Sequence, residues 1–234
     1  MEKVGFAEGH SFILDLLDVN SVCFDLGANR GNFASFIEAK TDASVVLVEP
    51  VAQLFDDLAT TGRRTKIRTI IRSEPGEATI NIYPNCCPSL MHLPSGGEPH
   101  RELVTCMTLE DIFSTIPGRE IGLVKMDIEG AEIDVLKSTP LEVLRRASQY
   151  TVEFHDFMEP SLKPGVAEVI RHMENGGFTT IRFSTDNTNV LFVRTDRLAH
   201  GVLSWAWLAG PVKYLSGLGR IASRMFRLER PGSV

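Results

Sequence analysis

Short apolar runs alternate along this chain with segments whose apolar residues recur every three or four positions. The apolar runs predict buried strands at 21–26, 44–49, 65–71, 122–127 and 149–155. The amphipathic segments predict helices at 32–40, 51–60, 131–138 and 165–175. This alternation is typical of a doubly wound α/β fold, in which helices cover both faces of a mostly parallel sheet.

Four segments depart from that alternation. Residues 77–83 place apolar and polar side chains in turn, which predicts a further strand with one solvated face. Segments 178–183 and 189–194 predict a closing antiparallel hairpin. The stretch 84–99 contains four prolines and two glycines, and we expect a loop there.

A glycine turn joins the first predicted strand to the first predicted helix, with the sequence Asp25-Leu26-Gly27-Ala28-Asn29-Arg30-Gly31. Glycines let backbone approach a ligand closely, and the helix start beyond them offers unpaired N–H groups to an anion. Glu49 ends the second predicted strand, where a carboxylate can accept hydrogen bonds from both hydroxyls of a ribose. The combination predicts a ligand that contains adenosine.

The spacing of the two glycines helps to distinguish a dinucleotide from an adenosine ligand that carries a methionine moiety. The dinucleotide fingerprint G-x-G-x-x-G needs a glycine where this chain has Asn29. Gly27 and Gly31 lie four positions apart, which suits a methionine moiety better than a pyrophosphate. A nicotinamide-dependent oxidoreductase is therefore disfavoured, and the chain also lacks a recognisable catalytic Tyr-Lys pair.

A second polar group follows the fourth predicted strand. Lys125 and Asp127 lie two residues apart and so share a face of the strand, where burial requires that they pair or meet a ligand. Glu153 and His155 bring polar side chains from the fifth strand to the same sheet edge, where open α/β sheets bind ligands. We expect Glu132 to stabilise the start of the next helix rather than to act in the site.

Five stretches resemble the FkbM-type methyltransferase family: 24–33, 46–50, 108–113, 124–137 and 152–156. The resemblance covers roughly residues 20 to 195 and is most specific at the KxDxEGxE stretch. It implies a class I methyltransferase sheet with strand order 3-2-1-4-5-7-6 and an antiparallel seventh strand.

The resemblance also implies S-adenosylmethionine as the cofactor. Its methionine end would lie against Asp25, Gly27, Ala28, Asn29 and Gly31, its ribose against Glu49 and its adenine near Ser73. Asp127, Glu153 and His155 would face the methyl acceptor.

We therefore predict O-methylation of a hydroxyl on a sugar, a lipid-linked glycan or a natural product, with His155 or Asp127 as general base. A divalent cation on Asp127, Glu153 and Asp156 is an alternative that we do not favour, because no metal-specific spacing is visible. A non-catalytic cofactor-binding or scaffold protein is the other functional class that the sequence leaves open.

Charge and composition limit the partners and the cellular location that we expect for this protein. The net charge of -6 over 234 residues argues against a nucleic-acid partner, which would require a basic surface. The sequence shows no signal peptide, and its four cysteines fit free thiols in a reducing compartment, so we expect a cytoplasmic protein. We place a domain boundary near residue 200. The tail 201–234 has five basic residues, one acidic residue and an amphipathic pattern, which indicates a membrane surface, an oligomer contact or docking on its own core.

Overall fold

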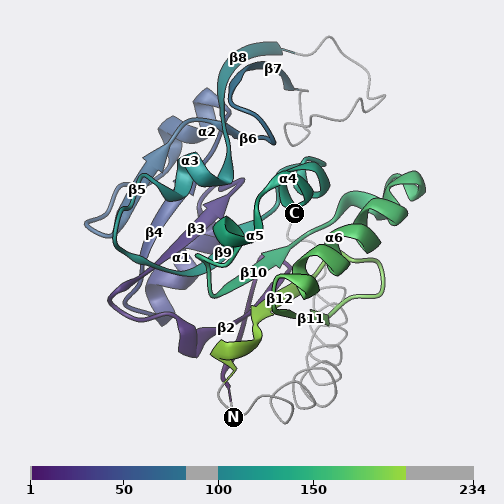
Figure 1. Cartoon of the computed structure of the whole chain (residues 1–234). Coiled ribbons are helices and arrows are strands. Elements are labelled where there is room, and N and C mark those ends of the chain that lie inside the picture. Colours follow the sequence, from purple (N-terminus) through teal and green to yellow (C-terminus); the bar gives the residue numbers. More distant parts are fainter. Residues whose placement is uncertain (1, 83–99, 199–234) are drawn as a thin grey trace, which may run out of the picture.

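A seven-stranded sheet forms the centre of the protein (Figure 1). The computed structural model describes residues 2–82 and 100–198. The expectations for the loop 84–99, for the domain boundary near 200 and for the tail 201–234 lie outside the described residues. Within the described ranges, no helix is long and apolar enough to cross a membrane.

The strands of the central sheet run side by side in an order that places β3 near the middle. The order is β11 (Phe178–Arg182), β12 (Val190–Arg194), β10 (Gln149–Val152), β9 (Glu120–Met126), β3 (Ser21–Leu26), β4 (Ser44–Val48) and β5 (Arg64–Ile67). β12 is antiparallel to both of its neighbours, and the other neighbouring pairs are parallel. The prediction of an α/β fold with a mostly parallel sheet is confirmed.

Helices cover both faces of this sheet (Figure 1). The described helices are α1 (Asn32–Lys40), α2 (Ala52–Asp57), α3 (Leu109–Phe113), α4 (Glu132–Ser138), α5 (Leu141–Leu144) and α6 (Lys163–Asn175). Consecutive side chains of a strand point to opposite faces. Cys23 of β3 accordingly packs in the core under α1, whereas Phe24 packs in the core under α3, α4, α5 and α6.

A second sheet of three strands lies beside the first, in the order β6 (Ile70–Ile71), β8 (His100–Met107) and β7 (Gly76–Ile82). β7 confirms the strand predicted at 77–83, whereas β8 was not expected. The single third strand predicted at 65–71 is wrong. The chain leaves the central sheet after Ile67, because the Thr69 hydroxyl donates to the Thr105 carbonyl at 2.8 Å and β6 pairs with β8.

The N-terminal residues form a hairpin of β1 (Val4–Ala7) and β2 (His10–Ile13), which the sequence pattern did not indicate. Side chains of the central sheet hold β2 in place. The Gln149 amide accepts from Ile13 N at 2.7 Å and donates to Ile13 O at 2.8 Å, and Ser11 N donates to Asn189 Oδ1 at 3.0 Å. These bonds position His10 against β10.

The strand predicted at 149–155 is shorter than expected. β10 ends at Val152, and Phe154 N donates to the carbonyl of Asn187 at 3.0 Å instead of continuing the ladder. His155 then begins a short 3-10 turn, His155–Phe157; similar turns occur at Leu14–Leu16, Pro160–Leu162 and Thr195–Arg197. The turn brings His155 toward the loop that follows β9.

Candidate active site

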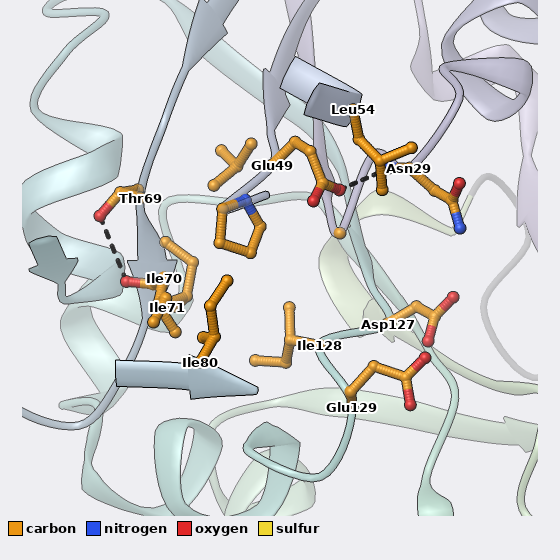
Figure 2. A pocket seen from close by; sticks show the side chains of 13 residues that line it. Asn29, Glu49, Leu54, Thr69, Ile70, Ile71, Ile80, Asp127, Ile128 and Glu129 are labelled. Carbon is orange, nitrogen blue, oxygen red and sulfur yellow. Dashed lines mark hydrogen bonds between the residues drawn. The ribbon is translucent and has the colours of Figure 1, made fainter. Parts of the chain in front are cut away.

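A pocket opens at the carboxyl ends of β3, β4 and β9 (Figure 2). Its volume is about 640 Å³ when the open solvent at its mouth is included. Its lining residues are Gly27, Asn29, Val48, Glu49, Pro50, Leu54, Thr69, Ile70, Ile71, Ile80, Asp127, Ile128 and Glu129. The place is the one where open α/β sheets bind ligands.

The glycine turn packs directly on the strand next to it. Gly27 has φ +79°, and a Cβ at this position would lie 1.9 Å from the backbone oxygen of Asp127. The N–H groups of Gly27 and Ala28 both donate to Val48 O, at 3.0 and 2.9 Å. Glycine is therefore required here by the neighbouring backbone of the protein, in addition to any approach of a ligand that the sequence suggested.

Glu49 lies buried at the wall of the pocket, with 2% of its surface exposed. One carboxylate oxygen accepts from Asn29 N at 2.8 Å (Figure 2), and the other accepts from Val51 N at 3.0 Å. Burial raises the pKa of Glu49, and these two N–H groups oppose that rise. Each oxygen of a carboxylate has a second lone pair, so Glu49 can still accept hydrogen bonds from a pair of ribose hydroxyls.

The structure divides the predicted cofactor residues into two groups. Gly27, Asn29 and Glu49 line the pocket. Asp25, Ala28 and Gly31 are buried in the strand end and the turn behind it and are not among its lining residues. Ser73 lines a neighbouring hollow of about 420 Å³ together with Arg72 and Asp134; this hollow and the main pocket share Glu129.

One side of the pocket is apolar and was not predicted as part of the site. Its side chains are Leu54 of α2, Ile70 and Ile71 of β6, Ile80 of β7 and Ile128 of the loop after β9 (Figure 2). Apolar side chains of this kind can pack against the faces of a purine ring. The alternating pattern at 77–83 indicated that Ile80 is buried, but only the second sheet places it beside Glu49.

Lys125 lies under the turn between two carboxylates. Its ammonium is 3.4 Å from Asp25 Oδ1 and 3.5 Å from Asp127 Oδ2, and it donates to Gly27 O at 2.7 Å. Burial lowers the pKa of Lys125, but the charges of Asp25 and Asp127 outweigh it and leave the pKa raised. The expected pairing of Lys125 with Asp127 is confirmed, and the pair ties the turn after β3 to the end of β9.

His155 faces three carboxylates. Its Nδ1 lies 3.2 Å from Glu132, and its Nε2 lies 3.5 Å from Glu129 and 3.9 Å from Asp127. Burial alone would lower the pKa of His155, but these carboxylates raise it to about 9. Glu132 also accepts from Ile128 N at 2.9 Å and Gly130 N at 3.1 Å, so it closes the loop after β9 and holds His155, beyond the helix-start role expected from the sequence.

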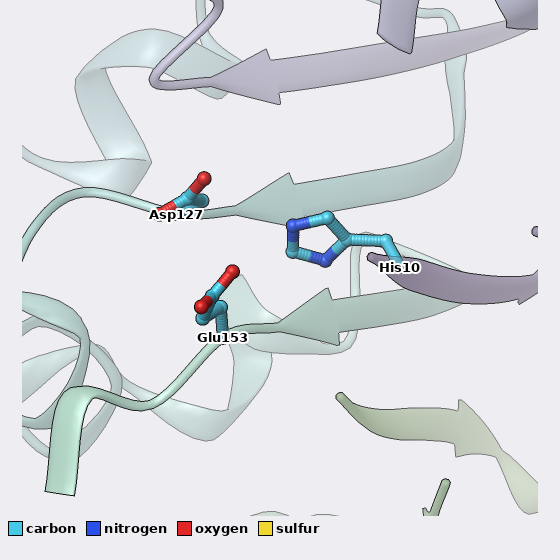
Figure 3. Close-up of side chains that lie close together, drawn as sticks. All are labelled: His10, Asp127 and Glu153. Carbon is cyan, nitrogen blue, oxygen red and sulfur yellow. The ribbon is translucent and has the colours of Figure 1, made fainter. Parts of the chain in front are cut away.

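A third group of side chains meets on the other side of Asp127 (Figure 3). Asp127, Glu153 and His10 each place a potential ligand atom within 4.8 Å of the others. Burial, followed by the charge of Asp127, raises the pKa of Glu153 to about 7, while burial lowers the pKa of His10 to about 3. Asp156, which the sequence suggested as a possible partner of Asp127 and Glu153, instead accepts from Asn187 at 2.9 Å.

Sequence reasoning did not identify His10. It lies 117 positions before Asp127, in a hairpin with no motif of its own, and no local pattern indicates its position. Of the predicted residues, Asp127 lines the pocket, and Glu153 and His155 each lie close to Asp127, as expected from their places after β9 and β10.

The chain is similar to one protein family and to several solved structures. The model of the methyltransferase FkbM domain matches residues 25–180, and no curated protein matches the chain. A fibrillarin pre-rRNA processing protein from Methanococcus jannaschii is similar at 10% identity and a TM-score of 0.46, with 82% of this chain and 71% of that chain covered. An rRNA methylase from Streptococcus thermophilus is similar at 12% identity and a TM-score of 0.44, with 76% of this chain and 88% of that chain covered. Aeropyrum pernix fibrillarin with bound S-adenosyl-L-methionine is similar at 10% identity and a TM-score of 0.43, with 82% of this chain and 81% of that chain covered.

Proposed function

Because this chain belongs to the family of methyltransferases with an FkbM domain, we propose that it methylates a hydroxyl group of a sugar, a lipid-linked glycan or a natural product. The family identifies the chain as an S-adenosylmethionine-dependent methyltransferase. The choice of oxygen as the acceptor atom, and the class of acceptor, are our proposal. It is supported mainly by the carboxylates of Asp127, which lines the pocket, and of Glu153, which lies beside Asp127.

The residues of the pocket fit the cofactor. Glu49 has lone pairs available for ribose hydroxyls, and Ile70, Ile80 and Leu54 form a wall of the kind that takes an adenine ring. The turn around Gly27 also lines the pocket and lies against the backbone of Asp127. This arrangement would place the methionine part of the cofactor beside Asp127.

When bound, S-adenosylmethionine supplies a methyl group on a sulfonium: the acceptor oxygen bonds to this carbon, the carbon–sulfur electron pair returns to sulfur, and the hydroxyl proton leaves to a carboxylate. Positioning the acceptor correctly lowers the barrier by up to about 7–11 kcal/mol in ideal cases. A base contributes roughly 10²–10⁴-fold more. Asp127 and Glu153 are half-buried, so both can contact a substrate and still bind it away from bulk water.

The geometry favours a carboxylate over His155 as the proton acceptor. Both ring nitrogens of His155 face carboxylates, Nδ1 toward Glu132 and Nε2 toward Glu129 and Asp127. The carboxylates raise the pKa of His155 to about 9, and a protonated imidazole has no lone pair left for a substrate proton. We therefore assign His155 the role of holding Asp127 and Glu129 in place, and Asp127 or Glu153 the role of base.

Calorimetry of the full chain with S-adenosylmethionine and with NADH tests the cofactor, and S-adenosylhomocysteine release tests turnover. The acceptors to compare are free and nucleotide-linked sugars, lipid-linked glycans and hydroxylated polyketides, each beside an analogue lacking the hydroxyl. We expect cofactor binding without NADH binding, and turnover only with hydroxyl acceptors. Methylation of the analogues at an equal rate would contradict the choice of oxygen, and binding without turnover on any acceptor would support a non-catalytic protein.

Variants separate binding from chemistry. Glu49→Gln should weaken cofactor binding by about tenfold or more, since a hydrogen bond to a charged group contributes roughly 1.5–3 kcal/mol. Asp127→Asn and Glu153→Gln should retain cofactor binding, and at least one of them should lose about 10²-fold or more in turnover. Glu174→Gln, on the exposed side of α6, is the matched control and should behave like the wild type. Wild-type turnover in both site variants would remove these carboxylates from the chemistry.

A further inference from the structure

Several buried polar atoms beside the site have no hydrogen-bond partner among the described residues, and Nε2 of His10 is one of them. His10 has no exposed surface, its Nδ1 lies 3.3 Å from the Thr151 hydroxyl, and its Nε2 has no hydrogen-bond partner among the described residues. Its ring points toward Asp127 and Glu153 (Figure 3). A buried polar nitrogen without a partner costs free energy, so its persistence here indicates a ligand that the nitrogen would bind.

The positive charge beside Asp127 is shared with other carboxylates: His155 lies 3.9 Å from Asp127 but also faces Glu129 and Glu132. Lys125 is shared between Asp127 and Asp25, at 3.5 and 3.4 Å. In the part of the chain that the structure describes, no lysine or arginine lies within ion-pair distance of Glu153. Half-buried carboxylates that face each other repel, and a cation between them would remove that repulsion.

The spacing of the three groups allows one ion to reach all of them. Their potential ligand atoms lie within 4.8 Å of one another. Ligand atoms about 2.1 Å from a divalent ion lie about 3 Å apart when adjacent and about 4 Å apart when opposite. The required approach is small, and the half-buried side chains of Asp127 and Glu153 can rotate to provide it, while Thr151 holds the His10 ring.

We propose that His10, Asp127 and Glu153 form a site for a divalent metal ion at the acceptor end of the pocket. One imidazole and two carboxylates suit Mn²⁺, Fe²⁺ or Zn²⁺ better than Mg²⁺, which prefers oxygen ligands alone. The second cluster, Asp127 with Glu132 and His155, is less suitable, because Glu132 already accepts two backbone N–H groups.

The ion gives the proposed methylation a specific chemistry, and this part of the inference rests on that proposed function. Three protein ligands leave coordination positions open, and Asp127 also lines the pocket, so an acceptor hydroxyl entering there can bind the ion. A bound hydroxyl is more acidic. With the ion bound, Asp127 and Glu153 act as its ligands instead of as the base proposed above. The hydroxyl proton then passes to solvent water, the oxygen bonds to the methyl carbon, and the carbon–sulfur electron pair returns to sulfur.

Manganese is the probe for the test, because Mn²⁺ is visible by electron paramagnetic resonance. The full chain is stripped of metal with EDTA, desalted and titrated with Mn²⁺ alone by calorimetry. Pulsed electron paramagnetic resonance of the bound Mn²⁺ then tests whether an imidazole nitrogen coordinates it, which would modulate the echo signal. We expect one saturable site per chain with nitrogen modulation. Glu153→Gln and His10→Gln should each weaken binding about tenfold or more, and His10→Gln should abolish the modulation.

Glu153→Gln keeps the test valid if a change at the buried His10 prevents folding, because Glu153 is half-buried and Gln has nearly the same shape. Glu174→Gln, on the exposed side of α6, is the matched control and should retain Mn²⁺ binding. Equal affinity in wild type and Glu153→Gln, or loss of binding in His155→Gln but not in His10→Gln, would overturn the site. If cofactor binding and methylation persist in EDTA, the metal site is rejected and the proposed function stands. If the chain binds Mn²⁺ but not the cofactor, the proposed function is rejected and the metal site stands.

Discussion

Replacement of Gly27 by alanine tests how closely the glycine turn packs on β9. Two costs follow from the structure. The φ of +79° is left-handed, which costs an L residue about 1–2 kcal/mol. The new Cβ would lie 1.9 Å from Asp127 O and 3.0 Å from Asp127 C, so backbone must move, and overpacking of this kind costs about 1–3 kcal/mol. Gly27→Ala should therefore lower the free energy of unfolding by about 2–5 kcal/mol.

Gly118→Ala is the matched control. Gly118 has nearly the same φ, +74°, but an added Cβ would have no atom within 4 Å. Gly118→Ala should lower the free energy of unfolding by only about 1 kcal/mol, the cost of the left-handed φ. Part of that cost is offset because alanine also makes the unfolded chain less flexible. The difference between the two variants isolates the contact with Asp127.

Urea denaturation followed by circular dichroism measures the free energy of unfolding of both variants, and calorimetry with S-adenosylmethionine measures the pocket. We expect Gly27→Ala to lose cofactor affinity as well, since its turn lines the pocket and moves with β9, and Gly118→Ala to bind normally. Equal destabilisation of the two variants, within about 0.5 kcal/mol, would refute the close approach of turn and strand.

Three further predictions concern stability and are checked by urea denaturation. Lys125→Met leaves Asp25 buried without its cation and should cost about 3–5 kcal/mol, part of which Asp25→Asn in the same chain should restore; an unchanged stability would contradict the ion pair. Thr108→Ala removes the side chain that accepts the N–H of Asp111 at the start of α3 and should cost about 1 kcal/mol; a loss below about 0.3 would mean that the cap is not needed. Burial tends to raise the pKa of Glu38, but hydrogen bonds from Arg64 and Thr61 outweigh it and lower the pKa. Glu38 therefore stabilises the fold above the ordinary glutamate value of 4.5, and this stabilisation is lost as the pH falls below it. Glu38→Gln should show a smaller loss of stability in acid than the wild type, and parallel curves would contradict the shift.

The N-terminal hairpin links the start of the chain to the chemistry at the far end of the pocket. Gln149 and Asn189 hold β2 by its backbone, so the position of His10 depends on bonds made by β10 and the residue before β12. His10 cannot follow Asp127 or Glu153 freely, because its ring is buried and its Nδ1 is held by Thr151. A metal ion bound by His10, Asp127 and Glu153 would therefore be positioned mainly by His10, whose ring is the least free to move.

Local pattern determined much of the sheet. Apolar runs bounded by turn residues predicted β3, β4 and β9, because a strand covered on both faces must be apolar along its length. The same logic predicted the site residues at strand ends. Asp127 and Glu153 follow adjacent parallel strands, and parallel strands end at one edge of a sheet.

Tertiary structure decided what local pattern could not contain. The chain leaves the central sheet after Ile67 because β8, more than 30 residues later, offers a better partner to Ile70 and Ile71. Glu132 is a site residue because the turn after β10 folds His155 against it. His10 meets Asp127 and Glu153 because Gln149 and Asn189 bind the backbone of β2. Each of these contacts joins residues far apart in the chain, and the free energy of such a contact depends on packing and hydrogen bonds that no short window of sequence specifies.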